Sequence, residues 1–157
     1  MKFSAHEEVA VPAGDLFDML CDFESLEDAA HRRGVDVVRT DATDGRLTGT
    51  AWQADVRLQG KPLRVDIVLL NLQRPEQIEL GMTGPGLEGG LAVALTGLAP
   101  QCTRLTVSAE LRPHTLTARL LVKSLKFTKT TLDRKFEARV AEYLQRLESR
   151  YAASRDD

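Results

Sequence analysis

Apolar and polar residues alternate along the opening stretch of the chain. In residues 2–11 the odd and even positions fall on opposite faces, which is the two-residue period of a half-buried β-strand. The face of odd positions carries Phe3, Ala5, Glu7, Val9 and Val11. Pro12 ends this strand, and the spacing then changes to that of helices. We expect two short helices here, over residues 13–22 and 25–33, the second stopping at Gly34.

The middle of the chain consists of short strand patterns separated by turns. The expected strands cover residues 35–40, 47–58, 63–72, 77–83, 91–97 and 103–111. The turns contain glycine or proline, which supply a positive or a fixed φ: Asp44-Gly45, Gln59-Gly60-Lys61-Pro62, Arg74-Pro75, Gly84-Pro85-Gly86 and Ala99-Pro100. Connections this short, with no helix among them, predict an antiparallel meander. With the first strand, the sheet has seven strands.

One face of this sheet is expected to be apolar and the other polar. In residues 63–69, for example, Leu63, Val65, Ile67 and Leu69 alternate with residues that include Arg64 and Asp66. The apolar face needs a cover, and the last third of the chain supplies one.

The C-terminal part carries the strongest helical pattern in the sequence. Its apolar stripe has a mean spacing of about 3.7 residues, close to the 3.6 of an α-helix. The stripe consists of Leu121, Leu125, Thr128, Leu132, Phe136, Val140, Tyr143 and Leu147. A helix over residues 116–151 would be about 54 Å long, whereas a domain of this size is about 40 Å across. We therefore expect an overhanging end, a bend or a separate first turn, with residues 128–131 as the weakest point.

The order of elements, together with two short stretches of sequence, resembles the START-like (SRPBCC, polyketide cyclase/dehydrase-like) superfamily. These stretches are Val9-Ala10-Val11-Pro12-Ala13-Gly14-Asp15-Leu16-Phe17-Asp18-Met19-Leu20-Cys21-Asp22, which is similar to the strand-Pro-Ala-helix opening of that family, and Thr103-Arg104-Leu105-Thr106-Val107 before the last helix. The resemblance implies an α+β helix-grip fold, in which a long C-terminal helix packs over a curved antiparallel sheet. Many relatives have a tryptophan just after the first helix, where this chain has Phe23 and Leu26.

The resemblance also implies a cavity between sheet and helix for an apolar or aromatic small molecule. Members of the superfamily include lipid carriers, aromatase/cyclases, hormone receptors and chaperone activators, so the fold alone does not select a function. The residues that we expect to line such a pocket are Trp52, Met82, Leu95, Leu121, Leu125, Thr128 and Leu132. The same residues are also compatible with simple core packing. Thr128 and Ser124 would either orient a ligand or bond to a backbone carbonyl one turn earlier.

The sequence contains no recognisable catalytic or metal-binding constellation. His6, His31 and His114 are isolated, so we expect neither a metal site nor a cofactor. Gly84-x-Gly86-x-x-Gly89 matches a dinucleotide-binding pattern, but it leads into a strand and is interpreted as a turn. Glu7 shares its face with apolar residues and is the one candidate for a general acid, unless it lies near a sheet end or pairs with a cation.

Composition and cysteine content fit one ordinary domain. The chain has 157 residues, 43% of them hydrophobic, and a formal net charge of −2, which argues against a nucleic-acid-binding domain. We expect a single START-like domain over residues 1–152, followed by a polar tail at 153–157. Without an apolar leader or a membrane-span pattern, a cytoplasmic location is expected. Cys21 and Cys102 are expected to be ordinary reduced thiols.

The charge is unevenly distributed. Residues 1–33 contain 3 basic and 8 acidic residues, whereas residues 112–150 contain 10 basic and 4 acidic residues. Arg119, Lys123, Lys126 and Lys129 lie on one side of the expected helix and form either a solvated or internally paired face, or a contact for an anionic membrane or acidic protein.

Three functions are compatible with these patterns. The first is a noncatalytic binding or carrier protein for an apolar small molecule such as a lipid, a quinone or an aromatic metabolite. The second is an aromatase/cyclase-type enzyme, with Glu7 or another buried polar group directing proton transfer. The third is an interaction module that uses the basic helix. The absence of a catalytic constellation favours the first.

Overall fold

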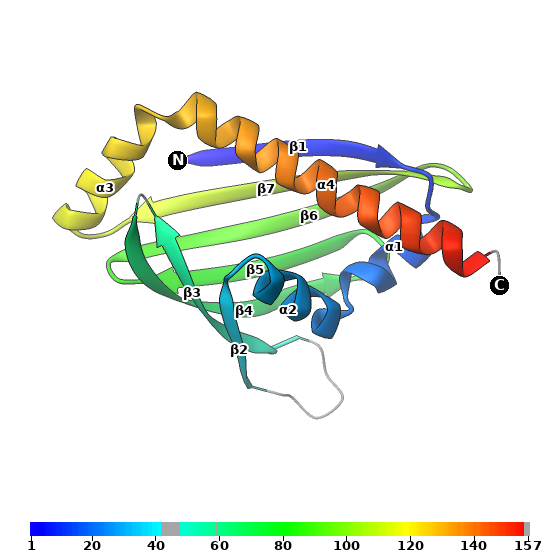
Figure 1. Cartoon of the computed structure of the whole chain (residues 1–157), viewed down its shortest axis with the longest axis horizontal. Helices are drawn as coiled ribbons and strands as arrows, with labels where there is room; N and C mark the ends of the chain where they lie inside the picture. The colour runs from blue at the N-terminus through cyan, green and yellow to red at the C-terminus, as the bar shows by residue number, and fades with distance from the viewer. Residues whose placement is uncertain (42–47, 59, 156–157) are drawn as a thin grey trace.

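The computed structural model describes residues 1–41, 48–58 and 60–155. Seven strands form one antiparallel sheet in the order β1-β7-β6-β5-β4-β3-β2 (Figure 1). The strands are β1 (Lys2–Val9), β2 (Asp36–Asp41), β3 (Ala51–Leu58), β4 (Lys61–Gln73), β5 (Gln77–Gly84), β6 (Leu87–Ala99) and β7 (Cys102–Pro113). The predicted meander is confirmed from β2 to β7, and β1 pairs with β7. The expected turn at Asp44-Gly45 and the expected strand start at Leu47 lie outside the described residues.

In the described residues, four helices complete the fold, and they lie where the sequence predicts helical structure. They are α1 (Ala13–Leu20), α2 (Phe23–Arg32), α3 (Leu116–Lys126) and α4 (Lys129–Arg155). In Figure 1, α4 runs diagonally across one face of the curved sheet, while α2 stands over the opposite side of that face. Helix α4 packs against β1, α2 against β2 and α3 against β7. This arrangement is the helix-grip fold, as predicted.

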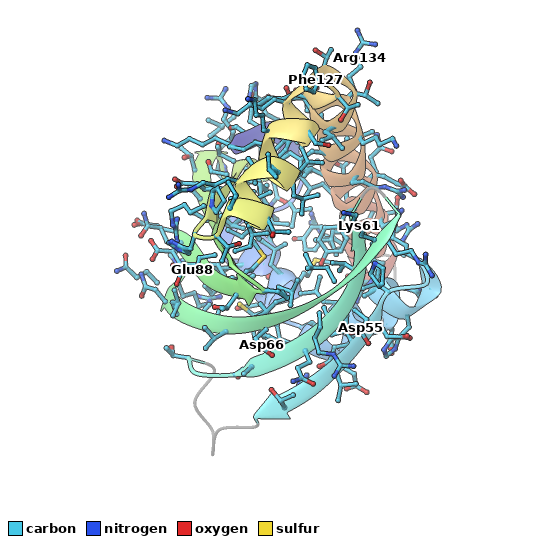
Figure 2. The ribbon with its side chains drawn as sticks, turned by 90° about the vertical axis from the view of Figure 1, so that its left-hand side faces the viewer. Asp55, Lys61, Asp66, Glu88, Phe127 and Arg134 are labelled. Carbon is cyan, nitrogen blue, oxygen red and sulfur yellow. The ribbon has the colours of Figure 1, made fainter. Side chains whose placement is uncertain are left out.

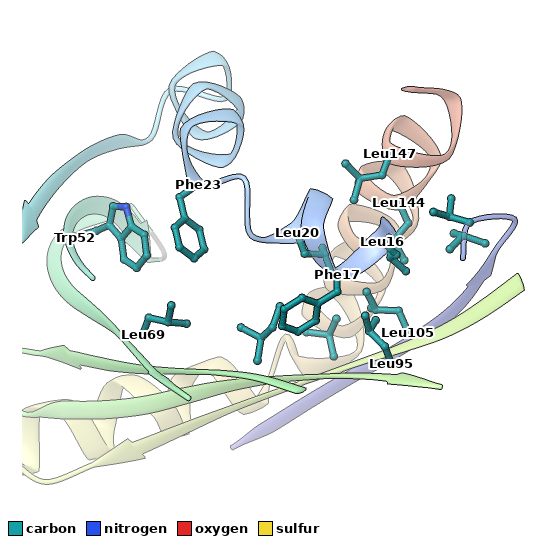
Figure 3. Packing of buried hydrophobic residues seen from close by; sticks show 14 residues of the cluster. Leu16, Phe17, Leu20, Phe23, Trp52, Leu69, Leu95, Leu105, Leu144 and Leu147 are labelled. Atoms are coloured by element: carbon teal, nitrogen blue, oxygen red, sulfur yellow. The ribbon is translucent and has the colours of Figure 1, made fainter. Parts of the chain in front are cut away.

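One part of the core lies where α1 packs between the sheet and α4. Leu16 and Phe17 of α1 are buried together with Leu95 of β6, Leu105 of β7 and Leu144 of α4 (Figure 3). Each fully buried leucine or phenylalanine contributes about 1.5–3 kcal/mol relative to an exposed one. This cluster therefore fixes α1 and the second half of α4 on the sheet.

The C-terminal helical region breaks at Phe127 and Thr128, so the break meets the predicted weak point of residues 128–131 at its first residue. The N–H groups of Phe127 and Thr128 donate to the carbonyls of Ser124 and Leu125, three residues back, over 3.3 and 3.1 Å. Bonds of this tighter type close the last turn of α3. The carbonyl of Thr128 then accepts the Leu132 N–H at 2.9 Å and begins α4. The two helices consequently take different directions, and α3 lies at one end of the sheet (Figure 1).

Strand β6 is longer than its predicted range of residues 91–97. Its additional N-terminal residues include Gly89 and Gly90, which pair with Met82 and Gly81 of β5. A Cβ atom at Gly89 would lie 2.7 Å from the Glu110 carbonyl oxygen, so the close approach of the β7 backbone requires glycine. The hydrophobic pattern missed these residues because glycine has no side chain to show which face it occupies.

The glycine-rich segment forms a hairpin turn, as predicted from its context. Gly84 ends β5, Gly86 has a φ of 65°, and Gly89 lies within β6. The turn also supports the start of α3, because the Gly86 carbonyl accepts the His114 N–H at 2.7 Å.

The end of α4 lies within the expected polar tail. Helix α4 continues to Arg155, so residues 153–155 of the expected polar tail are helical. Arg155 donates from its guanidinium to the Gln101 side chain at 3.1 Å, which ties the end of the helix to the β6–β7 turn. Of the helices in the described ranges, none is both long and apolar enough to cross a membrane.

The contact between the β5–β6 turn and α3 gives a first prediction. A Cβ at Gly86 would lie 2.3 Å from Oγ1 of Thr115, the residue whose side chain caps α3 by accepting the Ala118 N–H. Gly86→Ala should therefore lose the cap as well as forcing alanine into positive φ. Gly34→Ala is the matched control, because Gly34 has a φ of 81° and no neighbour within 4 Å of the added Cβ.

Urea unfolding followed by circular dichroism measures the difference. We expect Gly34→Ala to lower the free energy of unfolding by about 1–2 kcal/mol, and Gly86→Ala to lower it by about 1 kcal/mol more. Equal losses in the two variants would show that the turn does not support α3.

Candidate functional site

An apolar cavity of about 450 Å³ lies between the sheet, α2 and α4. This volume falls within the range of small-molecule sites, about 300–1,000 Å³. Its wall consists mainly of aliphatic and aromatic side chains. The wall residues from the helices are Leu20, Phe23, Leu26, Glu27, Ala30, Phe136, Arg139, Val140, Tyr143 and Leu144. Those from the strands are Val37, Trp52, Ile67, Ile78, Leu80, Leu91, Val93, Leu105 and Val107.

The regular periods of strand and helix place these side chains on one wall. Ile78 and Leu80 of β5, like Leu91 and Val93 of β6, are two residues apart and so face the same side of the sheet. On α4, Phe136, Val140, Tyr143 and Leu144 recur at helical spacing and face the sheet across the cavity. The apolar residues with which α4 covers the sheet thus also line the cavity.

A hydrogen-bonded network of polar side chains lies on the α2 side of the cavity. Oε1 of Glu27 accepts the Trp52 indole N–H at 3.0 Å and lies 2.7 Å from Nη2 of Arg39. Phe23 packs edge-on against Trp52, with their ring centroids 5.1 Å apart. The indole is therefore held from two sides, with its ring on the cavity wall and its polar edge satisfied.

Two further polar side chains lie on the α4 wall, Arg139 and Tyr143. Burial raises the pKa of Tyr143 to about 12, so its hydroxyl stays protonated at neutral pH. Arg139 is exposed, and it places a positive charge at the rim of a mainly apolar site.

The residues that the sequence predicts for one pocket lie in several different parts of the structure. Trp52 lies on the cavity wall. Met82 lines a second hollow of about 210 Å³, which shares Ile67 with the main cavity. Leu95 is buried in the core cluster beside α1 (Figure 3).

The four predicted residues from the C-terminal helical region lie away from both hollows. These residues are Leu121, Leu125, Thr128 and Leu132. For Leu121 and Leu125 the physical reason is the helix break, because α3 packs beside β7 and does not continue the stripe of α4 across the sheet. Thr128 lies at the break itself, and Leu132 lies in the first turn of α4. The Thr128 hydroxyl donates to the Leu125 carbonyl at 3.2 Å, which is the backbone-bonding alternative.

Glu7 lies half-buried on β1, opposite Leu105 of β7. Its side chain faces the same side of the sheet as Ala5 and Val9, as the alternation predicts, but it lines neither hollow. The carboxylate that does lie on the cavity wall is Glu27.

The other titratable candidates lie apart from the cavity. His6 is exposed, Nε2 of His31 bonds with the Val37 carbonyl oxygen at 2.9 Å, and Nε2 of His114 lies 3.1 Å from Glu88. In the described part of the chain, no three His, Cys, Asp or Glu side chains gather closely enough to hold a metal ion. Burial raises the pKa of the Cys21 thiol to about 11, which keeps it protonated. Cys21 and Cys102 are both free thiols.

Sequence reasoning missed most of the cavity wall, although part of the signal was present. Phe136, Val140 and Tyr143 belong to the helical stripe, so their orientation toward the sheet was predictable. Glu27 has no such signal, because its partners Arg39 and Trp52 lie 12 and 25 residues away on two strands.

Comparison with known proteins identifies the fold. No protein-family model and no curated protein matches the chain by sequence. Among solved structures, the Zhui aromatase/cyclase from Streptomyces sp. R1128 is 14% identical with a TM-score of 0.66, covering 93% of this chain and 94% of that one. A point mutant of norcoclaurine synthase from Thalictrum flavum, in complex with a transition-state analogue, is 11% identical with a TM-score of 0.66, covering 97% and 96%.

A START superfamily protein from Mycobacterium smegmatis is 19% identical with a TM-score of 0.56, covering 87% of this chain and 97% of that one. The similarity spans nearly the whole chain in each case. At these low sequence identities the similarity establishes the helix-grip fold alone. The function has to be inferred from the geometry of the site.

The network around Glu27 gives a second prediction. Glu27→Ala removes the acceptor of a buried indole N–H and the partner of Arg39, so we expect a loss of about 1–3 kcal/mol in the free energy of unfolding. Glu8→Ala is the control, since Glu8 and Arg104 form a 2.7 Å ion pair that is about half exposed. Removing that surface pair should cost less than about 1 kcal/mol. Urea unfolding of both variants measures the two values, and a Glu27→Ala loss no larger than the control's would contradict the assignment.

Proposed function

We propose that this protein is a noncatalytic binding or carrier protein for an apolar small molecule, such as a lipid, a quinone or an aromatic metabolite. The observation that carries the proposal is the cavity of about 450 Å³ between the sheet and α4, whose wall is apolar apart from Glu27, Arg139 and Tyr143. A ligand that buries about 300 Å² of apolar surface there would gain roughly 7 kcal/mol, before the entropic cost of association.

The polar groups of the wall support binding rather than turnover. Oε1 of Glu27 already accepts hydrogen bonds from Trp52 and Arg39, so this oxygen is occupied by partners within the protein. The Tyr143 hydroxyl, with its pKa near 12, suits a hydrogen-bond donor. Arg139 would favour a ligand with an electron-rich or anionic end at the rim.

The similar structures support small-molecule binding by this fold and do not separate a carrier from an enzyme. Norcoclaurine synthase, which shares the fold over nearly the whole chain, is bound to a transition-state analogue in its structure. The Zhui protein is an aromatase/cyclase, and catalysis on a small molecule is therefore compatible with the architecture. For this chain the composition of the wall favours the carrier function.

Ligand binding can be tested through the protein's own fluorescence. Trp52 is the single tryptophan of the chain and lies on the cavity wall, so a ligand in the cavity should change its emission. We expect saturable quenching on titration with the apolar aromatic probe 1-anilinonaphthalene-8-sulfonate. Native mass spectrometry of the purified protein would show whether an apolar molecule is carried through purification and is displaced by the probe.

A pair of neighbouring substitutions locates the bound probe. Ala30 lies on the cavity wall, whereas the neighbouring Ala29 lines a separate surface hollow with Arg146 and Arg150. Ala30→Phe should fill the cavity and weaken binding at least about tenfold, a change of roughly 1.4 kcal/mol, while Ala29→Phe should leave the affinity within about twofold. Thermal unfolding of both variants controls for the fold. Equal affinities in the two variants, or quenching that does not saturate, would overturn the proposal.

A further inference from the structure

Helix α3 exposes a stripe of large apolar side chains to the surroundings. Leu116 is 73% exposed, Leu120 is 59% exposed and Phe127 is 88% exposed. Their spacing of four and seven residues places them on one side of the helix. Figure 2 shows Phe127 at the apex of the molecule, where α3 meets α4. We call this stripe, with the basic residues beside it, the outer face of α3.

The exposed residues are not needed to hold α3 in place. Its opposite side carries Ala118, Val122 and Leu125, all of which are buried. Ala118 and Val122 pack with Leu87 of β6 against the end of the sheet. A helix in a soluble protein ordinarily pairs one apolar side with one polar side, so a second apolar side indicates a surface that contacts something else.

The outer face also carries positive charge. Arg119, Lys123 and Lys126 are exposed, and the sequence of α3 from Leu116 to Lys126 contains no acidic residue. At helical spacing Lys123 lies within the apolar stripe, and Arg119 and Lys126 lie along one edge of it. Lys129, the fourth residue of the expected basic face, is instead bound to Asp133 at 2.8 Å and lies over the Phe3 ring.

The shape of the outer face of α3 favours a deformable partner such as a lipid bilayer. The stripe lies on a convex helix at one end of the molecule, and Phe127 projects from it (Figure 2). None of the hollows that we describe is lined by Leu116, Leu120 or Phe127. A projecting aromatic ring with flanking cations matches the boundary between lipid headgroups and acyl chains, which can deform around it.

We propose that the outer face of α3 docks reversibly on an anionic membrane surface. Phe127, Leu120 and Leu116 enter the boundary between headgroups and acyl chains, and Arg119, Lys123 and Lys126 lie against the lipid phosphates. Each basic residue near such a surface strengthens binding by about fivefold. The docking site lies at the end of the sheet beside the smaller hollow, which shares Ile67 with the main cavity. Docking goes beyond ligand binding and does not depend on it.

Vesicle sedimentation tests the proposal on the whole chain. We expect the protein to sediment with vesicles of phosphatidylcholine and phosphatidylserine at a 7:3 ratio in about 0.1 M salt. Binding should fall at least about tenfold with phosphatidylcholine alone, and likewise at about 0.5 M salt, because salt screens the charges. No sedimentation with the anionic vesicles would overturn the proposal.

Matched variants locate the contact. The double variant Leu120→Ser with Phe127→Ser should bind anionic vesicles at least about tenfold more weakly, while Leu98→Ser, which changes an exposed leucine near the far end of β6, should bind like the parent protein. Lys123→Glu should weaken binding about tenfold, and Arg32→Glu at the end of α2 should not. All substituted residues are exposed, so the variants should retain the parent's thermal unfolding.

Other occupants of the outer face give different results. If the face joins two copies of the chain, size-exclusion chromatography would show a dimer that Phe127→Ser dissociates, with no vesicle binding by the parent protein, and the proposal would fail. The ligand-site variant Ala30→Phe should keep full vesicle binding. A failure of docking can therefore be told apart from a failure of the proposed ligand binding.

Discussion

The structure depends on how the apolar face of a curved sheet is covered. Helix α4 has 27 residues and is therefore about 40 Å long, but a single helix contacts only a strip of a seven-stranded sheet. At one end the space behind the sheet is filled, because α1 inserts Leu16 and Phe17 between α4 and the strands. Between α2 and α4 no element of the described residues is inserted, and the space between the facing side chains is the cavity.

The sequence was sufficient to predict that helices cover the apolar face of the sheet, but not where a cavity remains between them and the sheet. The two-residue and 3.6-residue periods predict which side chains turn inward, and Trp52 and Tyr143 do so. Whether an inward side chain packs against another side chain or borders a cavity depends on the distance between the sheet and the helix that faces it. No local sequence pattern encodes that distance. Leu95 and Trp52 have equivalent patterns, yet Leu95 is beside α1 and packs in the core while Trp52 borders the cavity.

The break between α3 and α4 was predictable from chain length and propensity, but its consequence was not. A single stripe from Leu121 to Leu147 implies one continuous wall. The turn at Phe127 and Thr128 divides that stripe between two surfaces, so Leu125 is buried at the end of the sheet while Phe136 faces the cavity. The contact of Glu27 with Trp52 and Arg39 could not be predicted from the sequence for a related reason. It joins α2, β3 and β2, which only the tertiary structure brings together.

The same break gives the positive charges of the C-terminal region two different environments. On α4, Lys129 and Arg146 pair within the helix with Asp133 and Glu142, and Arg150 lies 3.9 Å from Asp22 of the acidic opening segment. Internal pairing, one of the two explanations for the charge asymmetry, thus applies to Lys129, Arg146 and Arg150 of α4. Within the described residues it does not extend to α3, which has no acidic residue of its own and lies at the opposite end of the sheet from α1. Because α3 combines these cations with an exposed apolar stripe, the asymmetry is concentrated on a surface suited to an external anionic partner.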